Sequence, residues 1–288
     1  MLIEIVEDIG KLTFRMIAAL ANAAPVPVRG GVAGVCAGFD YVLSGAKRRN
    51  VAENIAAAGL PATPGRVLRI FKLHATNVIE MFASSAWENE TILEWCELEG
   101  RVELDRALAG GKGVILVSVH TGSWELAGRC LQALGYRLHV VAGVQMNRLL
   151  TGAVRDAKEK RGIEVINPDD SYRKLLKALA SNGVVILLVD GNIYTGGVEL
   201  PFFGRMTRLP DGPAKLSRAS GAPVLGGYCR RAGNKALRMH VEHIMDAGEI
   251  ESHSEQVALA KIYGVVERFI GQNVDQWCMF RRFWGRES

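Results

Sequence analysis

The sequence predicts an α/β protein with a mostly parallel central sheet flanked by helices, preceded by a helical N-terminal segment. Two observations predict the sheet. Continuous apolar runs, "GVILVSV" at 113–119 and "VVILLVD" at 184–190, are typical of strands that are buried on both faces. Between and after them, strand-like runs alternate with helix-like stretches that end at glycine, as at Gly135, Gly162 and Gly183.

Residues 1–50 are predicted to form a helical, membrane-surface segment. The apolar stretch Leu12–Ala24 contains Arg15 and stops at Pro25, and its thirteen residues are fewer than the roughly 20 that a helix needs to cross a bilayer. The chain also begins with acidic residues, unlike the basic start of a signal peptide. Packing of this helix into the protein's own core is equally compatible with the composition. The glycine-rich stretch 29–50 is expected to be a loop that enters another helix.

Residues 51–288 are predicted to form a single α/β domain. A long amphipathic helix covers 66–88, because its apolar residues recur at helical spacing. The segments after it alternate between short apolar runs and stretches with helix-capping residues. The expected strands are 113–119, 137–144, 164–167, 184–190, 223–231 and 236–244. The expected later helices are 124–135, 150–162, 171–183, 211–222 and one from about Glu255 to the C-terminus.

The composition narrows the classes of partner. Hydrophobic residues make up 49% of the 288-residue chain and charged residues 23%, which is typical of a folded protein. The formal net charge of +5 suits anionic partners such as phosphates or acidic lipid head groups. Lysine and arginine form no long block, so nucleic acid is not an expected partner. The five cysteines are scattered without a C-x-x-C pair, which predicts free thiols and no zinc site.

Two ionisable residues follow the two buried strands. His120 comes directly after 113–119, and Asp190 ends 184–190. Because ligands bind at the carboxyl ends of parallel strands, both side chains are expected at one functional edge of the sheet. A neutral imidazole there can take the proton of an alcohol that attacks a thioester or ester, while a carboxylate fixes its tautomer. The chain has no G-x-S-x-G motif, so direct transfer is favoured over a covalent acyl-enzyme.

Three blocks of the chain resemble one known family. The string "SVHTGSWELAG" at 118–128 resembles the H-x4-D/E motif of the bacterial lipid A biosynthesis (lysophospholipid) acyltransferase superfamily. The blocks 187–224, with "ELPFFG" and "SRASGAPV", and 265–284, with "DQWCMFRRFW", resemble its later segments in the same order. The resemblance implies a glycerolipid acyltransferase-like fold. The matching residues of the first block are His120, Gly122, Trp124 and Glu125.

The resemblance also implies roles for individual residues. His120 is expected to be the catalytic base, with Glu125 as its motif partner. Glu199, in "GGVELPFFG", matches an acidic position that phosphatidylinositol-mannoside acyltransferases use to orient the histidine, so the orienting carboxylate stays open between the two glutamates. Glu125 could also be purely structural, because an acid in the first turn of a helix complements the helix dipole. The candidate substrate-binding residues are Asp190, Arg155, Lys158, Arg161, Ser123 and Arg208.

The implied activity is that of an O-acyltransferase. It would move a fatty acyl chain from acyl carrier protein or coenzyme A to a hydroxyl of a membrane lipid or glycolipid, with no metal or redox cofactor. The implied location is the cytoplasmic face of a bacterial inner membrane, where the protein would bind peripherally. Aromatic and basic residues stand together in "QWCMFRRFWGRES", which suits an anionic membrane surface and makes Phe283 and Trp284 the candidate anchors. Gly191 stands where the family usually has glutamine or arginine, so the acceptor stays open and includes phosphatidylinositol mannoside or an aminolipid. A non-catalytic lipid-binding protein and a hydrolase are two further functions that this sequence leaves open.

Overall fold

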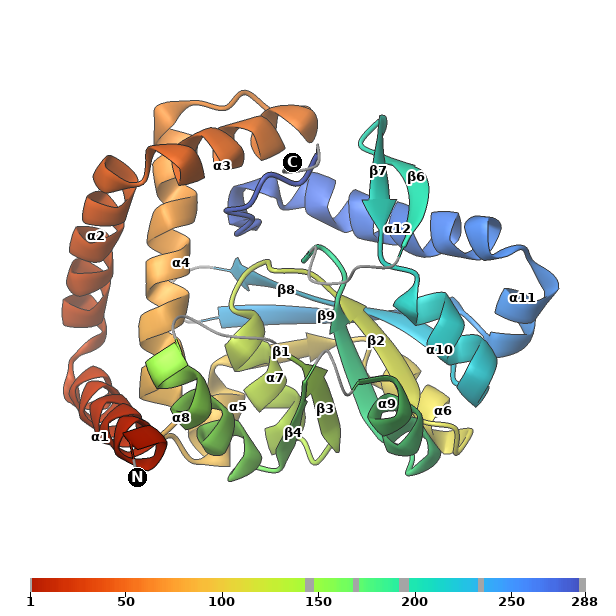
Figure 1. Ribbon diagram of the computed structural model, residues 1–288, viewed down its shortest axis with the longest axis horizontal. Coiled ribbons are helices and arrows are strands. Elements are labelled where there is room, and N and C mark those ends of the chain that lie inside the picture. The colour runs from red at the N-terminus through yellow and green to blue at the C-terminus, as the bar shows by residue number, and fades with distance from the viewer. Residues whose placement is uncertain (1, 143–147, 168–170, 192–196, 233–235, 285–288) are drawn as a thin grey trace.

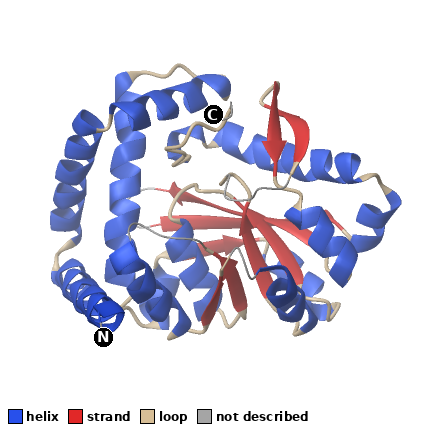
Figure 2. Cartoon of the chain, viewed as in Figure 1, coloured by secondary structure: helices blue, strands red, loops and turns tan. Residues whose placement is uncertain are grey.

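A central β-sheet organises the computed structural model, which describes residues 2–142, 148–167, 171–191, 197–232 and 236–284 (Figures 1 and 2). In this part of the chain the sheet has seven strands in the order β1-β9-β8-β2-β5-β3-β4. All neighbours are parallel except β8 and β9, which are antiparallel. The strands are β1 Cys96–Glu99, β2 Val114–Ser118, β3 Leu138–Val141, β4 Ile163–Ile166, β5 Val184–Leu188, β8 Val224–Ala232 and β9 Ala236–Met245.

Helices cover both faces of this sheet. The later helices are α5 Asn89–Glu94, α6 Arg101–Ala109, α7 Trp124–Ala133, α8 Arg148–Glu159, α9 Ser171–Ala180, α10 Gly212–Ser220, α11 Ala247–Ser252 and α12 Glu255–Gln272. Along β2, Ile115 and Val117 join the hydrophobic cluster that contains α9, α10 and α12 residues. Val114 and Leu116 join the cluster on the other face, with α7. The predicted α/β architecture is thus confirmed, because each face of β2 is buried under helices.

The N-terminal region is more helical than expected. Its helices are α1 Leu2–Ala23, α2 Val26–Leu43, α3 Gly45–Ala57 and α4 Pro64–Ser84. The expected loop over 29–50 is wrong: α2 and α3 fill it, and α3 runs through the predicted boundary at residue 50. Small residues allow α2 to pack closely against α4, because Ala33 and Ala37 are buried where the two helices meet. No described helix is both long and apolar enough to cross a bilayer.

The C-terminal segment also differs from the prediction. The last helix, α12, ends at Gln272 instead of continuing to the C-terminus, and a short 3-10 turn, η2 Val274–Gln276, follows it. The chain then folds back against the body of the protein. Trp284 is buried there, and its Nε1 donates to the Phe202 carbonyl at 3.1 Å. The prediction that Trp284 anchors the protein in a membrane is therefore wrong, and Phe283 packs on the same core.

A two-stranded hairpin stands apart from the main sheet (Figure 1). It consists of β6 Val198–Phe202 and β7 Arg205–Leu209, which pair antiparallel. Phe203 and Gly204 turn the chain with positive φ angles of 49° and 70°. This pair of left-handed residues suits a tight two-residue hairpin turn.

Candidate functional site

The site lies where β2 and β5 end side by side. Ser118 and Leu188, the last residues of these parallel strands, are register partners. His120 and Asp190 each follow two residues later, so the sheet brings their side chains together. The expectation that both residues reach one edge of the sheet is confirmed.

Asp190 holds the imidazole and main chain of His120. The Nδ1 of His120 donates to Asp190 Oδ1 at 2.7 Å, and the main-chain N–H of His120 donates to Oδ2 at 2.8 Å. Trp277 Nε1 donates to the same Oδ2 at 2.8 Å. The Asp190 side chain is fully buried, whereas 29% of the His120 side chain is exposed. The carboxylate is thus fixed inside the protein, while one side of the ring faces outward.

This pairing sets the tautomer and the basicity of His120. Burial lowers the pKa of the imidazole, but the charge of Asp190, its hydrogen bond and the charge of Glu125 outweigh burial, so the pKa lies above its ordinary value. Because Nδ1 carries the donated proton, the lone pair of the neutral ring lies on Nε2. No hydrogen bond between described residues uses Nε2. His120 therefore presents a free proton acceptor of increased basicity.

A tight turn holds the main chain after His120. Gly122 has a φ of +54°, and a Cβ at this position would lie 2.7 Å from the Cys229 carbonyl oxygen. The Gly122 carbonyl accepts from Asn77 Nδ2, and the His120 carbonyl accepts from the Cys278 N–H at 2.8 Å. Glycine at 122 is required both by the conformation and by the close approach of β8.

Glu125 lies apart from the imidazole. Its carboxylate forms an ion pair with Lys158 on α8, with Oε2 2.9 Å from Nζ. The two side chains are only 19% and 14% exposed. The described contacts include no hydrogen bond from Glu125 to His120. The carboxylate on Nδ1 is Asp190, which the resemblance placed among the substrate-binding residues.

The hairpin residues are also separate from the imidazole. Glu199 is exposed on β6, directly opposite Arg208 on β7. Within the described contacts, nothing joins Glu199 to His120. An orienting role for Glu199 therefore remains a prediction that no contact supports.

The remaining predicted binding residues lie in three different places. Lys158 and Arg161 line one small pocket with Glu125. Arg155 does not line this pocket, and its guanidinium donates instead to Asn167 Oδ1 at 2.7 Å. Ser123 is buried, and its hydroxyl lies 3.5 Å from the carboxylate of Glu80 on α4, so it belongs to the support of the turn.

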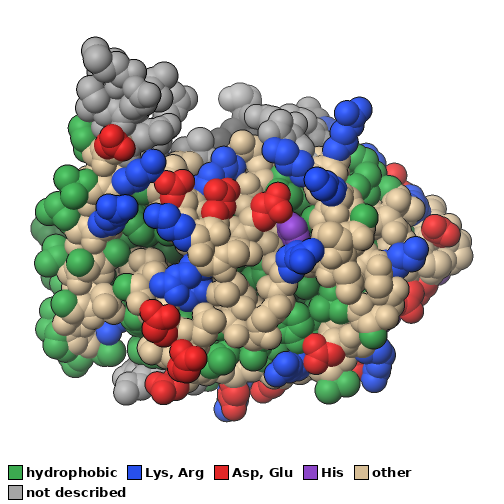
Figure 3. Space-filling model, turned by 90° about the horizontal axis from the view of Figure 1, so that it is seen from below, with side chains coloured by type: hydrophobic (Ala, Val, Ile, Leu, Met, Phe, Trp, Pro, Cys, Tyr) green, Lys and Arg blue, Asp and Glu red, His purple; other side chains and the backbone are tan. Residues whose placement is uncertain are grey.

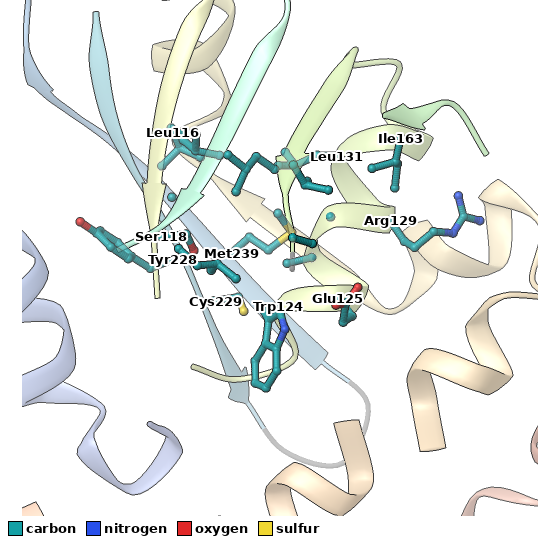
Figure 4. A pocket seen from close by; sticks show the side chains of 18 of the residues that line it. Leu116, Ser118, Trp124, Glu125, Arg129, Leu131, Ile163, Tyr228, Cys229 and Met239 are labelled. Carbon is teal, nitrogen blue, oxygen red and sulfur yellow. The ribbon is translucent and has the colours of Figure 1, made fainter. Parts of the chain in front are cut away.

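A larger apolar cavity adjoins the site (Figure 4), and the empty space in and around it, open solvent included, is about 860 Å³. Trp124 and Glu125, in the first turn of α7, form part of its wall, and the Trp124 ring meets the His120 ring edge-on at 5.0 Å. Aliphatic side chains from the sheet and α7 form much of the rest. These include Leu116, Leu131, Val140, Ile163, Ile186, Leu188 and Met239.

Sequence reasoning missed two residues of the site. Trp277 is not among the site residues that the sequence predicts, although it lies in the "DQW" string that carries part of the family resemblance. Arg129 gives no signal beyond its place four residues after Glu125 on a helix. Both reach the site through packing between distant parts of the chain.

Comparison with known proteins places the chain in a family. The family model described as bacterial lipid A biosynthesis acyltransferase matches residues 66–286. A phosphatidylinositol mannoside acyltransferase of Mycobacterium tuberculosis is 36% identical over 134 residues, 45% of this chain but only 42% of the relative. The Mycolicibacterium smegmatis protein of that name is 26% identical over 247 residues, 83% of this chain and 81% of the relative. The lipid A biosynthesis palmitoleoyltransferase of Escherichia coli is 26% identical over 204 residues, 68% and 63% of the two chains. The chain belongs to the bacterial lipid A biosynthesis acyltransferase family.

Proposed function

We propose that this protein transfers a fatty acyl chain from a thioester, carried by acyl carrier protein or coenzyme A, to a hydroxyl of a membrane lipid or glycolipid. The observation that carries the proposal is the His120–Asp190 pair at the sheet edge. It combines a buried orienting carboxylate with a partly exposed imidazole whose Nε2 is used by no hydrogen bond between described residues, which is the arrangement that a general base requires. Family membership supports the same reaction class.

In the proposed reaction, Nε2 of His120 takes the proton of the acceptor hydroxyl as its oxygen attacks the thioester carbonyl. The tetrahedral intermediate collapses by breaking the C–S bond, and the imidazolium returns the proton to the leaving thiolate. The products are an ester and a thiol. Asp190 accepts from Nδ1–H throughout and stabilises the imidazolium. Glu125 adds negative charge near the ring, in line with its effect on the pKa of His120.

The apolar cavity beside Trp124 is the proposed site of the acyl chain. Its largely aliphatic wall suits a flexible hydrocarbon. Trp124 lines this cavity and its ring packs against the His120 ring, so the end of the cavity at Trp124 is next to the imidazole. The thioester carbonyl would lie at that end.

The acceptor that we propose is a phosphorylated glycolipid. The M. smegmatis relative matches most of both chains and is named for a phosphatidylinositol mannoside, which favours this acceptor over lipid A. A lipid A precursor remains the second candidate because of the similarity to the E. coli protein. The two are distinguished by supplying each purified acceptor with the same radiolabelled acyl donor.

We propose that α1 and α2 bind the membrane surface peripherally, on the cytoplasmic side of the bacterial inner membrane. Hydrophobic side chains gather along the edge of the molecule that these helices form, at the left of Figure 3. They repeat at three- to four-residue spacing, as a helix lying on a bilayer requires. The exposed residues include Ile9, Leu12, Met16, Leu20, Val28, Val32, Val35, Phe39 and Val42.

A vesicle assay tests the membrane proposal. Leu20→Glu together with Phe39→Glu removes two anchors, so binding to phosphatidylglycerol vesicles is expected to fall at least about tenfold in a sedimentation assay. Val102→Glu replaces an equally exposed apolar residue on α6 and is expected to bind as the unmodified protein does. Equal binding by all three proteins would contradict the membrane role of α1 and α2.

A transfer assay tests the reaction itself. His120→Ala is expected to abolish acyl transfer from a radiolabelled donor, while thermal unfolding reports that the variant is folded. Unchanged transfer by His120→Ala would overturn the proposed mechanism. Release of free fatty acid without an acceptor product would indicate a hydrolase. Donor binding with no turnover by the unmodified protein would indicate a lipid-binding relative.

A further inference from the structure

A buried ion pair joins the carboxyl end of β8 to α4. Arg231 donates through Nη1 to Glu80 Oε1 at 2.9 Å and through Nη2 to Glu80 Oε2, and Nη2 also donates to Asn77 Oδ1 at 2.8 Å. Asn77 and Glu80 are three residues apart on α4, so both face the same side of the helix. The side chains of Arg231 and Glu80 are only 19% and 9% exposed, and Asn77 is buried. One planar guanidinium therefore fixes two side chains of α4 at once.

The directed bonds of this guanidinium are what the contact supplies. Burying two opposite charges has a desolvation cost that offsets much of their attraction, so apolar residues of similar size would stabilise the fold about as well. Apolar residues cannot supply several hydrogen bonds that share one fixed orientation. The ion pair is therefore better explained by the groups that it holds in place than by its own stability.

The same two side chains of α4 also hold the tight turn after His120. Nδ2 of Asn77 donates to the Gly122 carbonyl. The Ser123 hydroxyl lies 3.5 Å from Glu80 Oε2. Because Oδ1 of Asn77 accepts from the guanidinium, the amide is oriented with its Nδ2 toward the turn. The position of the turn thus depends on the arginine of β8.

The main chain of Arg231 holds a second segment of the site. Its N–H donates to Gln276 Oε1 at 2.7 Å, and Gln276 Nε2 donates to its carbonyl at 3.1 Å. Gln276 directly precedes Trp277, whose Nε1 donates to Asp190 Oδ2 at 2.8 Å. The next residue, Cys278, donates its N–H to the main-chain carbonyl of the motif histidine at 2.8 Å. The supports of the imidazole and of its carboxylate therefore meet at Arg231.

From these contacts we propose that Arg231 is a positioning residue that keeps His120 and Asp190 in hydrogen-bonding geometry. It acts through Asn77 on the turn, and through Gln276 on the segment whose indole binds the carboxylate. This role requires no contact between the arginine and substrate. It deepens the proposed function and rests on it for the kinetic readout, whereas the state of the imidazole can be measured without turnover.

The geometry of His120 and Asp190 determines the basicity of the ring. Both the ring and the main chain of His120 donate to the carboxylate, so a displaced turn would lengthen both bonds. Burial and the charge of Arg281 lower the pKa of the imidazole, whereas Asp190 and Glu125 raise it. Burial lowers the pKa of His74, the titratable neighbour on α4, so that it stays neutral at neutral pH. Weaker bonds to the carboxylate leave burial dominant, and the pKa of His120 then falls.

Arg231→Lys and Asn77→Leu test this role by steady-state transfer and by nitrogen-15 NMR of His120. Lysine keeps the positive charge beside Glu80 but lacks the planar fork, and leucine keeps the volume of Asn77 but removes its bond to the turn. In both variants kcat is expected to fall by about 10- to 100-fold, with KM within about threefold of the unmodified value. The pKa of His120 is expected to fall as well, so the rise of kcat/KM with pH moves to lower pH.

Arg66→Met is the matched control. Arg66 also joins α4 to the segment after α12, through a partly buried ion pair with Asp275 in which Nε lies 2.5 Å from Oδ1. No described contact joins Arg66 to the turn after His120. Its loss is expected to lower the melting temperature while kcat and the pKa of His120 stay unchanged.

The outcomes separate positioning from stability. Lower kcat with a lower pKa of His120 in Arg231→Lys and Asn77→Leu, and neither change in Arg66→Met, supports the role. Folded Arg231→Lys and Asn77→Leu proteins with unchanged kcat and pKa overturn it, and so does an equal loss of kcat in Arg66→Met. A higher KM at unchanged kcat also overturns it, since Arg231 would then serve substrate binding. If one of the two test variants does not fold, the other decides.

Failure of this role is distinguishable from failure of the proposed function. An unmodified protein that transfers no acyl chain would contradict the proposed function. The NMR comparison of His120 between the unmodified protein and the Arg231→Lys variant would still decide whether the arginine positions the imidazole.

Discussion

The two ionisable residues of the H-x4-E motif occupy different environments. His120, at the end of β2, is held by a buried carboxylate from the neighbouring strand. Glu125, in the first turn of α7, faces α8 and pairs with Lys158 in a pocket that contains two further cations. The carboxylate that holds the motif histidine is therefore seventy positions away in sequence.

This difference assigns separate tasks to the two carboxylates. Asp190 touches the ring and fixes its tautomer, whereas Glu125 acts on the ring only through its charge. The contact of Glu125 with Lys158 links it to the cavity where the acyl chain is proposed to lie. Loss of Asp190 should consequently affect the chemical step, and loss of Glu125 should affect substrate binding more strongly.

The largest effect is expected for Asp190→Asn. The amide cannot hold Nδ1–H and stabilise an imidazolium as a carboxylate does, so kcat is expected to fall by about 10³-fold or more at neutral pH. The measurement is steady-state transfer from an acyl thioester. Asp211→Asn, which breaks an exposed pair with Lys215, is the control and should retain kcat. A fall of less than tenfold in Asp190→Asn would remove Asp190 from the mechanism.

A smaller effect is expected for Glu125→Gln. The change leaves Lys158 without its counterion and alters the binding pocket, so KM is expected to rise and kcat/KM to fall by about tenfold to a hundredfold. Comparison of kcat and KM between this variant and Asp190→Asn is the measurement. If Glu125→Gln lost as much kcat as Asp190→Asn with an unchanged KM, the division of tasks would be contradicted.

The smallest effect is expected for Trp277→Phe. This change removes one of the three hydrogen bonds that Asp190 accepts and keeps most of the aromatic volume. We expect kcat to fall by about threefold to tenfold with little change in KM. Trp284→Phe is the matched control, since Trp284 lies in the same aromatic cluster but donates to the Phe202 carbonyl. An equal loss in both variants would mean that packing, and not the bond to Asp190, accounts for the effect.

The fold was predictable where hydrophobic pattern alone determines it. The runs that became β2 and β5 are buried on both faces, and the glycines at 135, 162 and 183 close helices or turns as expected. The helix α2 was missed because glycine disfavours helices in isolation, while here small residues pack against α4. The hairpin β6–β7 contains Pro201, which obscures its strand pattern. After α12 the chain returns to place Trp284 against the Phe202 carbonyl, a contact that sequence does not reveal.

The site was predictable only in part. His120 and Asp190 each follow an apolar run that forms a strand, β2 and β5. Because parallel strands end at the same edge of a sheet, the sequence predicted that the two side chains lie at one edge. Motif spacing suggested Glu125 as the orienting partner, yet α7 starts at Trp124 and directs the Glu125 carboxylate toward α8. Trp277 and Arg129 reach their places through tertiary packing, which leaves no local pattern.

The protonation state of His120 tests the central claim most directly, and nitrogen-15 NMR of the imidazole measures it. In the unmodified protein, the neutral ring is expected to carry its proton on Nδ1. Its pKa is expected to lie above the ordinary value of about 6.5, so acyl transfer should rise as pH rises through that pKa. Asp190→Asn should lower the pKa, because burial then dominates, whereas Glu125→Gln should keep the Nδ1–H tautomer. A proton on Nε2 in the unmodified protein, or loss of the Nδ1–H tautomer only in Glu125→Gln, would contradict the account.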